Sequence, residues 1–313
     1  MVSNPFAAVI GQPQAVTLLS QAIDRDRIAP AYLFAGVPGV GRSLTARCFA
    51  TRLLQRSTQD DRVLQQRIQQ GNHPDLLWVE PTYLHQGKRV SATEAADLGI
   101  KRKTAPQIRL EQIREIGQFL SRPPLEAARS IVVIEQAETM AEPAANGLLK
   151  TLEEPGRATI ILLAPGVESL LPTLVSRCQI IPFQRLSPDA IAQILQQNYA
   201  ELLQSPEVLA LAQGSVSSAI AGWQQLQVIP AELRTDLMQP PRSTRHALEL
   251  ARQVAQLELE TQLWLIDYLQ QHYWQQTRQP WLLQPLETAR QALQAFAQAR
   301  LVWEVTLLAI APA

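Results

Sequence analysis

The sequence has few cysteines, few aromatic residues and no long hydrophobic segment. Its two cysteines, Cys48 and Cys178, are far apart and lack C-x-x-C spacing, which excludes a disulfide framework and a four-cysteine zinc site and favours a reducing compartment. Apolar runs such as 160–164 are far shorter than the roughly 20 residues of a membrane-spanning helix. No basic-then-apolar signal segment opens the chain. We therefore expect a soluble cytoplasmic protein without a membrane partner.

The chain also lacks an excess of either charge. Lys and Arg number 28, as do Asp and Glu, so the formal net charge is +0. This balance argues against a dedicated nucleic-acid coat protein, although it permits one basic patch. Aromatic residues make up 5% of the chain, and hydrophobic residues of all kinds 46%, which favours helix-rich packing of aliphatic side chains. A length of 313 residues predicts two domains, or three.

Helical and strand-like patterns alternate in the first 186 residues. Helical spacing of apolar residues is present over 12–27 and 43–56. Short β-branched or apolar runs predict five strands, at 31–35, 76–79, 130–134, 159–164 and 179–183. This alternation is typical of an α/β fold, with a parallel sheet covered by helices on both faces.

Beyond residue 186 the patterns are helical. Ser187-Pro188-Asp189 and Ser205-Pro206-Glu207 each place a hydroxyl, a proline and an acid in the order that starts a helix. Two long helical patterns follow, at 244–274 and 286–310. The sequence therefore predicts three domains: an α/β domain at 1–186, a small helical domain at 187–228 and an all-helical domain at 229–313.

A glycine-rich segment follows the first predicted strand and opens a helix. Its spacing is that of a phosphate-binding loop, G-x-x-x-x-G-K-[ST], with arginine in the lysine position; the matching residues are Gly36, Gly39, Gly41, Arg42 and Ser43. Glycines let the backbone turn and point N–H groups at phosphate oxygens. Arginine is longer and fork-shaped, so it does not replace the compact lysine ammonium conservatively. Ser43 retains a hydroxyl that could ligate Mg²⁺.

The residues expected to complete such a site are also changed. A hydrolase needs an Asp after the strand at 130–134 to hold Mg²⁺, and usually a Glu next to it to orient water. The sequence has Glu135 and Gln136 instead, and an amide has no useful basicity. We interpret the site as vestigial. The alternative is that Arg42 and Glu135 still allow nucleotide binding without turnover.

Three segments together resemble a known family. The loop at 36–43, the segment 145–155 (ANGLLKTLEEP) and the segment 171–178 (LPTLVSRC) are similar to those of the bacterial clamp-loader ATPases of the AAA+ superfamily, in particular the delta-prime branch of DNA polymerase III subunits. Matching motifs extend from residue 4 to about 183. The resemblance implies a P-loop AAA+ domain with a five-stranded parallel sheet, a helical lid at 187–228 and a helical collar at 229–313 that joins subunits into a ring.

The resemblance also implies a function. It suggests a largely non-catalytic subunit of the replicative clamp loader, which acts with gamma/tau and delta subunits to place the sliding clamp (beta) on primed DNA. ATP and Mg²⁺ would be held by neighbouring subunits, so no cofactor is expected here. Arg177 matches an arginine finger that acts on the neighbour's nucleotide. The alternative role for Arg177 is a local ion pair at a helix end. No zinc is expected, because 55–72 has no cysteine.

Other interpretations remain open from the sequence. One is a catalytically active gamma/tau-like ATPase subunit in which Arg42 and Glu135 replace the usual pair; a weaker one is a small-molecule kinase. Against an active ATPase stand Ala164-Pro165 and Ser217, where hydrolysing relatives carry nucleotide-sensing residues. The segment 84–109 holds six basic and two acidic residues, so it is either a contact for DNA phosphates or an acidic partner, or a solvated loop.

Overall fold

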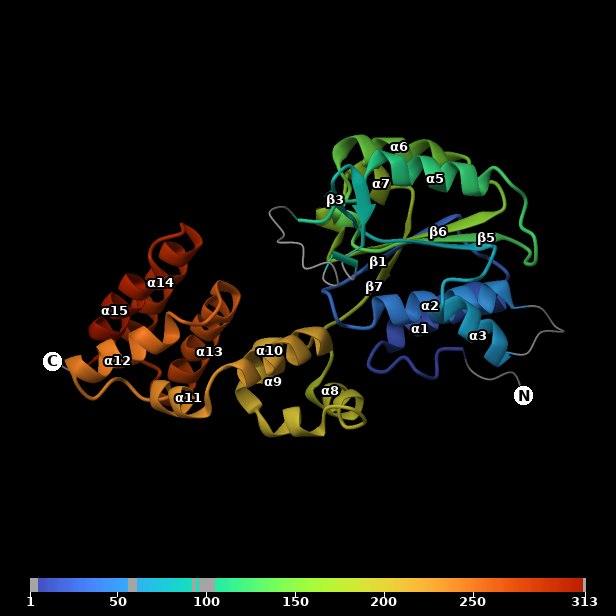
Figure 1. Ribbon diagram of the computed structural model, residues 1–313. Coiled ribbons are helices and arrows are strands. Elements are labelled where there is room, and N and C mark those ends of the chain that lie inside the picture. The colour runs from blue at the N-terminus through green and yellow to red at the C-terminus, as the bar shows by residue number, and fades with distance from the viewer. Residues whose placement is uncertain (1–4, 56–60, 92–93, 96–104, 312–313) are drawn as a thin grey trace. The chain divides into compact units, whose positions relative to one another are not determined.

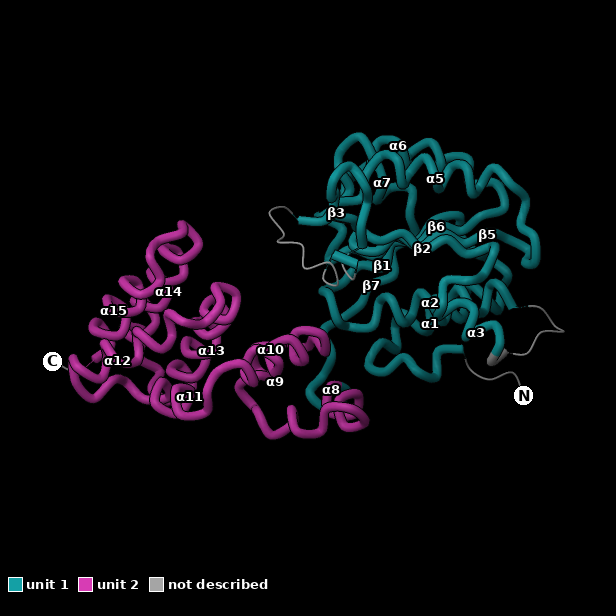
Figure 2. Tube along the Cα trace, viewed as in Figure 1, with its two compact units in different colours: residues 1–190 teal, residues 191–313 magenta. Residues whose placement is uncertain are grey.

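The computed structural model describes residues 5–55, 61–91, 94–95 and 105–311. The chain divides into two compact units, residues 1–190 and 191–313 (Figure 2). Among the described residues, none of the helices combines the length and the apolarity needed to cross a membrane.

The N-terminal unit is built on a five-stranded parallel sheet. Its strand order is β2-β5-β6-β1-β7. The strands are β1 (Ala31–Ala35), β2 (Leu76–Val79), β5 (Ser130–Ile134), β6 (Ala158–Ala164) and β7 (Gln179–Pro182). Every residue of β5 and β6 is buried, as expected for parallel strands covered on both faces. All five strands lie where the sequence predicts them, to within one residue at either end, so the predicted fold class is confirmed.

Helices cover both faces of this sheet (Figure 1). One face carries α1 (Pro13–Asp24), α2 (Arg42–Leu54) and α3 (Asp61–Gln69). The other carries α5 (Leu110–Leu120), α6 (Glu142–Glu153) and α7 (Pro172–Val175). Apolar residues of α5 and α6, such as Ile113 and Leu148, pack with the sheet in one buried core. Two short 3₁₀ turns, Ala137–Thr139 and Val167–Ser169, follow β5 and β6.

The predicted basic segment 84–109 contains ordered structure that the sequence analysis missed. Strands β3 (Tyr83–His85) and β4 (Lys88–Val90) form an antiparallel hairpin. Its two-residue turn, Gln86-Gly87, has positive φ at both positions, the geometry that glycine favours in tight hairpins. Strands of three residues are too short to show an alternating pattern. The basic residues 101–103 lie outside the described residues.

The C-terminal unit consists of helices. Helix α8 (Pro188–Leu195) crosses the boundary between the two units. Two 3₁₀ turns follow it along the chain, at Ala200–Gln204 and Pro280–Leu282. The α-helices after α8 are α9 (Pro206–Ala212), α10 (Val216–Val228), α11 (Ala231–Leu237), α12 (Thr244–Val254), α13 (Leu259–Thr277), α14 (Leu283–Gln294) and α15 (Ala299–Ile310). Both α9 and α10 pack against α13. The division into a lid at 187–228 and a collar at 229–313 stays a prediction.

Each of the two long helical patterns is two helices in the structure. The pattern at 244–274 breaks between α12 and α13, and that at 286–310 breaks between α14 and α15. Neither break contains Gly or Pro, and Phe296 in the second takes a left-handed φ of 59°. The chain turns because the helices pack on one another: α12 against α15, and α14 against both α13 and α15. Sequence periodicity alone does not show such a turn.

The start of the phosphate loop is held between two strands. Gly36 N–H donates to the Ala164 carbonyl at 3.1 Å, and Phe183 N–H donates to the Ala35 carbonyl at 2.7 Å. A Cβ atom on Gly36 would lie 2.5 Å from the carbonyl oxygen of Phe183 and 2.6 Å from its Cβ. No side chain fits at this position, because the obstacle includes backbone.

We predict that Gly36→Ala lowers the unfolding free energy of the N-terminal unit by about 1–3 kcal/mol, the usual cost of overpacking. The matched control is Gly117→Ala in α5, where no atom lies within 4 Å of an added Cβ. It should raise stability by about 0.5–1 kcal/mol, because alanine favours the helix. Urea denaturation of both variants measures the two effects, and equal effects would contradict the packing argument.

Candidate functional site

The phosphate loop joins β1 to α2. Gly39 has φ 77° and Gly41 has φ 100°, a left-handed region that side chains disfavour. Helix α2 begins at Arg42, so its free N–H groups lie at the loop. The backbone arrangement that the glycine spacing predicts is therefore present.

A buried glutamine supports this loop from inside the chain. Gln12, 3% exposed, donates from Nε2 to the carbonyls of Val40 at 3.1 Å and Gln184 at 2.7 Å. Its Oε1 accepts from Gln184 N–H at 3.0 Å. These bonds tie the loop to the segment after β7 without any ligand. From the sequence, Ile10-Gly11-Gln12 is one of the segments that resemble the family, but the resemblance gave the Gln12 side chain no role.

Arg42 is a buried cation among carboxylates. The residue is 8% exposed, and its Nη1 has no hydrogen-bond partner among the described residues. Burial lowers the pKa of its guanidinium, while the nearby carboxylates of Glu138 and Glu135 act in the opposite direction. Arginine keeps its charge in proteins. The positive charge at the lysine position of the loop therefore already faces negative groups of its own chain.

The segment after β5 supplies these carboxylates. Glu135 is half-buried, and its N–H donates to the Val79 carbonyl at 2.9 Å. Gln136 is exposed and has φ 47°. Glu138, which the sequence analysis missed, has its pKa raised mainly by burial, and Arg42 opposes that rise. Among the described residues, no group of three or more His, Cys, Asp or Glu is placed to hold a metal ion.

Arg177 lies just after α7 and is exposed. Its Nη2 donates to Glu153 Oε1 at 2.6 Å, and its Nη1 donates to the Thr173 carbonyl at 3.0 Å. Its neighbours anchor it, because Leu174 is fully buried and Cys178 packs against the core. The local ion pair that the sequence left open is therefore present. Exposed pairs of this kind contribute only about 0–1 kcal/mol.

Arg177 and the phosphate loop lie at opposite ends of the paired strands β1 and β7. Strands β1 and β7 are parallel, with Tyr32 opposite Gln179 and Ala35 opposite Pro182. The loop follows the carboxyl end of β1, whereas Arg177 precedes the amino end of β7. Roughly 10 Å of paired strand, three steps of about 3.3 Å, lies between the two ends. The structure thus brings Arg42 and Glu135 together and keeps Arg177 apart from them.

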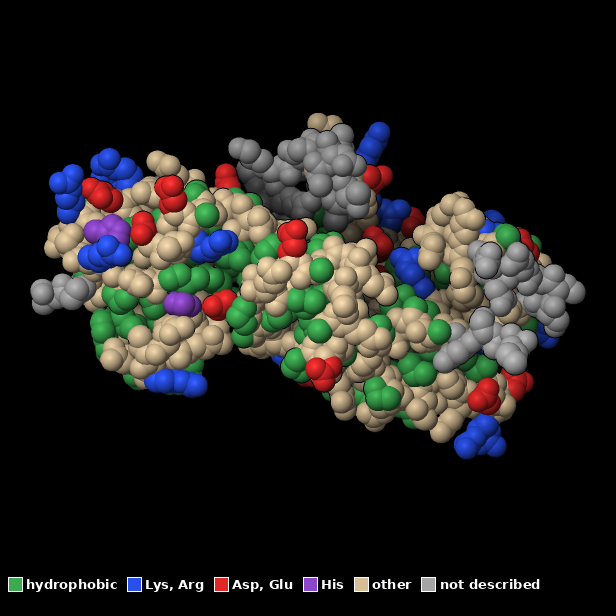
Figure 3. Space-filling view, turned by 90° about the horizontal axis from the view of Figure 1, so that it is seen from below, with side chains coloured by type: hydrophobic (Ala, Val, Ile, Leu, Met, Phe, Trp, Pro, Cys, Tyr) green, Lys and Arg blue, Asp and Glu red, His purple; other side chains and the backbone are tan. Residues whose placement is uncertain are grey.

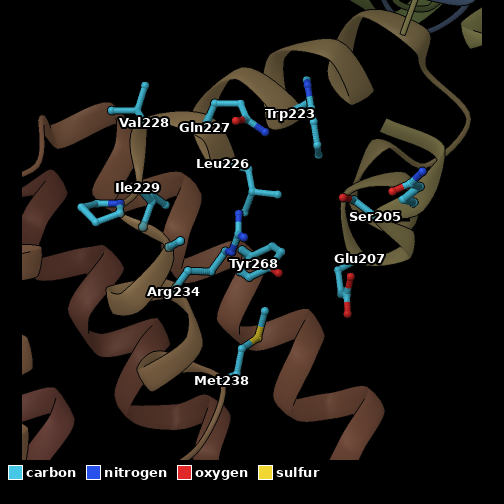
Figure 4. Close-up of a pocket in the computed structure, with 13 residues that line it drawn as sticks. Ser205, Glu207, Trp223, Leu226, Gln227, Val228, Ile229, Arg234, Met238 and Tyr268 are labelled. Carbon is cyan, nitrogen blue, oxygen red and sulfur yellow. The ribbon is translucent and has the colours of Figure 1, made fainter. Parts of the chain in front are cut away.

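A pocket of about 480 Å³ lies within the C-terminal unit. Figure 4 shows Ser205 and Glu207 across from Arg234, with Tyr268 and Leu226 between them. Burial raises the pKa of Tyr268 to about 12, with Glu207 adding to the rise and Arg234 opposing it. None of the predicted site residues lines this pocket.

Comparison with known proteins shows which family the chain belongs to. A family model described as "DNA polymerase III, delta subunit" matches residues 11–187, more than half of the chain. The chain belongs to this family. A second model, "Cyanobacterial DNA polymerase III delta prime, C-terminal domain", matches residues 189–310. The two matches together span the phosphate loop, the Arg177 segment and nearly all of the C-terminal unit.

Two individual relatives bear the name of a DNA polymerase III subunit, in agreement with the family matches. DNA polymerase III subunit delta' of Bacillus subtilis is 34% identical over 58% of this chain, which covers 50% of that protein. The subunit of the same name from Pseudomonas aeruginosa is 34% identical over 66% of this chain and 60% of its own length. The chain thus spans about half to three fifths of these relatives.

A solved structure shares the fold. It is a "dna polymerase iii, gamma subunit-related protein" of Thermotoga maritima, with a TM-score of 0.54, 18% identity, and coverage of 94% of this chain and 97% of that one. At this identity the likeness shows the fold alone.

The environment of Cys178 predicts slow alkylation. Burial raises the pKa of its thiol to about 11. Because only the thiolate reacts, we expect Cys178 in a Cys48→Ala background to react with iodoacetamide at pH 8 about a hundredfold more slowly than an ordinary cysteine. The rate should keep rising about tenfold per pH unit up to pH 10. The urea-unfolded chain is the control, and equal rates in both states would show that Cys178 is not shielded.

Proposed function

We propose that this member of the family is a largely non-catalytic, delta-prime-like subunit of the cytoplasmic replicative clamp loader of DNA polymerase III. It acts with gamma/tau and delta subunits to load the sliding clamp (beta) on primed DNA. Support comes from the two family matches and from relatives named delta'. The observation that carries the proposal is the separation of the altered phosphate loop from the exposed Arg177.

The chain's own loop is unsuited to turnover. Arg42 stands where a lysine would reach the phosphates, and the carboxylates of Glu135 and Glu138 face it. A nucleotide phosphate would have to compete with these carboxylates for the same cation. Gln136 also lacks the basicity needed to activate water. We infer that the chain needs neither ATP, Mg²⁺ nor zinc of its own, and that its loop is retained for structure.

Arg177 is suited to act on another subunit. It cannot serve its own phosphate loop, because the two lie at opposite ends of the paired strands β1 and β7. Its guanidinium is exposed and held by a weak ion pair, so it can exchange that carboxylate for a phosphate of a neighbouring chain. An arginine supplied in trans stabilises the charge that develops during phosphoryl transfer.

The deciding experiment uses a reconstituted loader in which only the adjoining ATPase site is active. Arg177→Ala should slow hydrolysis there by about 10³-fold or more while the complex still assembles. Arg122→Ala is the control: it removes another exposed arginine of the same unit, one without an ion pair among the described residues, and should change nothing. Unchanged hydrolysis in Arg177→Ala would remove the finger role.

The last helix carries an exposed apolar face. Leu301, Val305 and Leu308 of α15 are 57%, 61% and 38% exposed. Their spacing of four and three residues places them on one side of the helix. Hydrophobic side chains are visible on the surface of this unit at the left of Figure 3. We infer that this face of α15 contacts partner subunits of the loader, which supports the proposed hetero-oligomer.

Charge on this face should block assembly. We expect the double variant Leu301→Asp, Val305→Asp to fold, since both side chains are exposed, but to lose co-purification with the partner subunits. The control is Gln284→Asp, an exposed polar position in the first turn of α14 where an acid is tolerated. Circular dichroism verifies folding. Retained co-purification of the double variant would exclude this face as the interface.

A further inference from the structure

Glu153 breaks a local rule of helix chemistry. It is the last residue of α6, and Glu154 follows it directly. The carbonyl groups at a helix C-terminus carry partial negative charge, so acids are disfavoured there and bases favoured. Residues that violate a local preference often do so for function. Glu153 forms an ion pair with Arg177 at 2.6 Å, in addition to the basic residue Lys150 in the last turn of α6.

Two acceptors hold the Arg177 guanidinium in one orientation. The Glu153 carboxylate accepts from Nη2 and the Thr173 carbonyl accepts from Nη1. These bonds use two of the five N–H donors of the side chain. The side chains of Arg177 and Glu153 stay 36% and 52% exposed, so water and an incoming anion reach both. The pair is therefore ordered, yet open to exchange.

We propose that Glu153 is a positioning residue that stores Arg177 in the free chain and must release it before the guanidinium engages a phosphate. The inference rests on the proposed finger role of Arg177. While the carboxylate stays bound, it cancels the positive charge that the phosphate needs. Release is easy because the contact involves a single carboxylate oxygen on an exposed surface. Glu153 therefore limits how often Arg177 is available.

This role predicts opposite effects for the two partners of one ion pair. Glu153→Gln keeps the size of the side chain but removes its charge, so Arg177 is released more often. In the reconstituted loader, kcat/KM for ATP at the adjoining site should rise about two- to fivefold, the range that an exposed pair allows. Arg177→Ala should lower it. If the pair served only stability, both changes would leave kcat/KM unchanged or reduce it.

The matched control is Glu154→Gln. Glu154 is exposed, adjacent in sequence, and makes no side-chain ion pair or hydrogen bond among the described residues, so kcat/KM should stay at the wild-type value. In an Arg177→Ala background, Glu153→Gln should have no effect, because its partner is absent. In the isolated chain, NMR should show faster rotation of the Arg177 guanidinium in Glu153→Gln than in the wild type.

The outcomes separate the two proposals. If Arg177→Ala slows hydrolysis but Glu153→Gln leaves kcat/KM unchanged or lower, the storage role is overturned and the finger stands. If Arg177→Ala has no effect, the proposed function fails and the storage role fails with it. A rise in kcat/KM for Glu153→Gln that disappears in the Arg177→Ala background supports both. Co-purification of every variant with the partner subunits verifies that assembly is intact.

Discussion

The pairing of β1 with β7 is the constraint on which the rest of the N-terminal unit depends. The end of β1 is packed so closely against Phe183 that only glycine fits at position 36. The Gln12 side chain then ties the loop to the segment after β7. The same pairing fixes where β7 begins, and with it Arg177, two residues earlier. One strand pair therefore positions the phosphate loop and the exposed arginine, at opposite ends of its two strands.

The two arginines of the candidate site, Arg42 and Arg177, have opposite surroundings. Arg42 is buried, its pKa is lowered by desolvation, and carboxylates of its own chain face it. Arg177 is exposed, and its one carboxylate partner is also exposed. Negative charge that the chain itself places near a buried cation weakens the attraction of that cation for a further anion. An exposed, weakly paired guanidinium exchanges partners readily. In the proposed function, the loop is kept for shape while Arg177 stays available to another chain.

Much of the fold can be predicted from local sequence patterns. The five sheet strands coincide with short apolar or β-branched runs bounded by turn residues, so their positions follow from the sequence, although the first two residues of β7 are exposed. The glycine spacing of 36–43 likewise predicts a loop between a strand and a helix. The hairpin at 83–90 was missed because its strands have three residues each. The turns within 244–274 and 286–310 were missed because they contain neither glycine nor proline, so only the packing of α12 on α15 and of α14 on its neighbours produces them.

The sequence by itself determined the parallel α/β sheet, the phosphate loop and the changes at Arg42, Glu135 and Gln136. These features depend on residue type and spacing within short segments. Only the tertiary structure decided that Glu138 lies near enough to Arg42 to act on its charge, that Gln12 supports the loop, and that Glu153 holds Arg177. Each of these contacts joins residues 24 or more positions apart in the chain. No local pattern encodes such contacts, because strand order and helix packing set which distant residues meet.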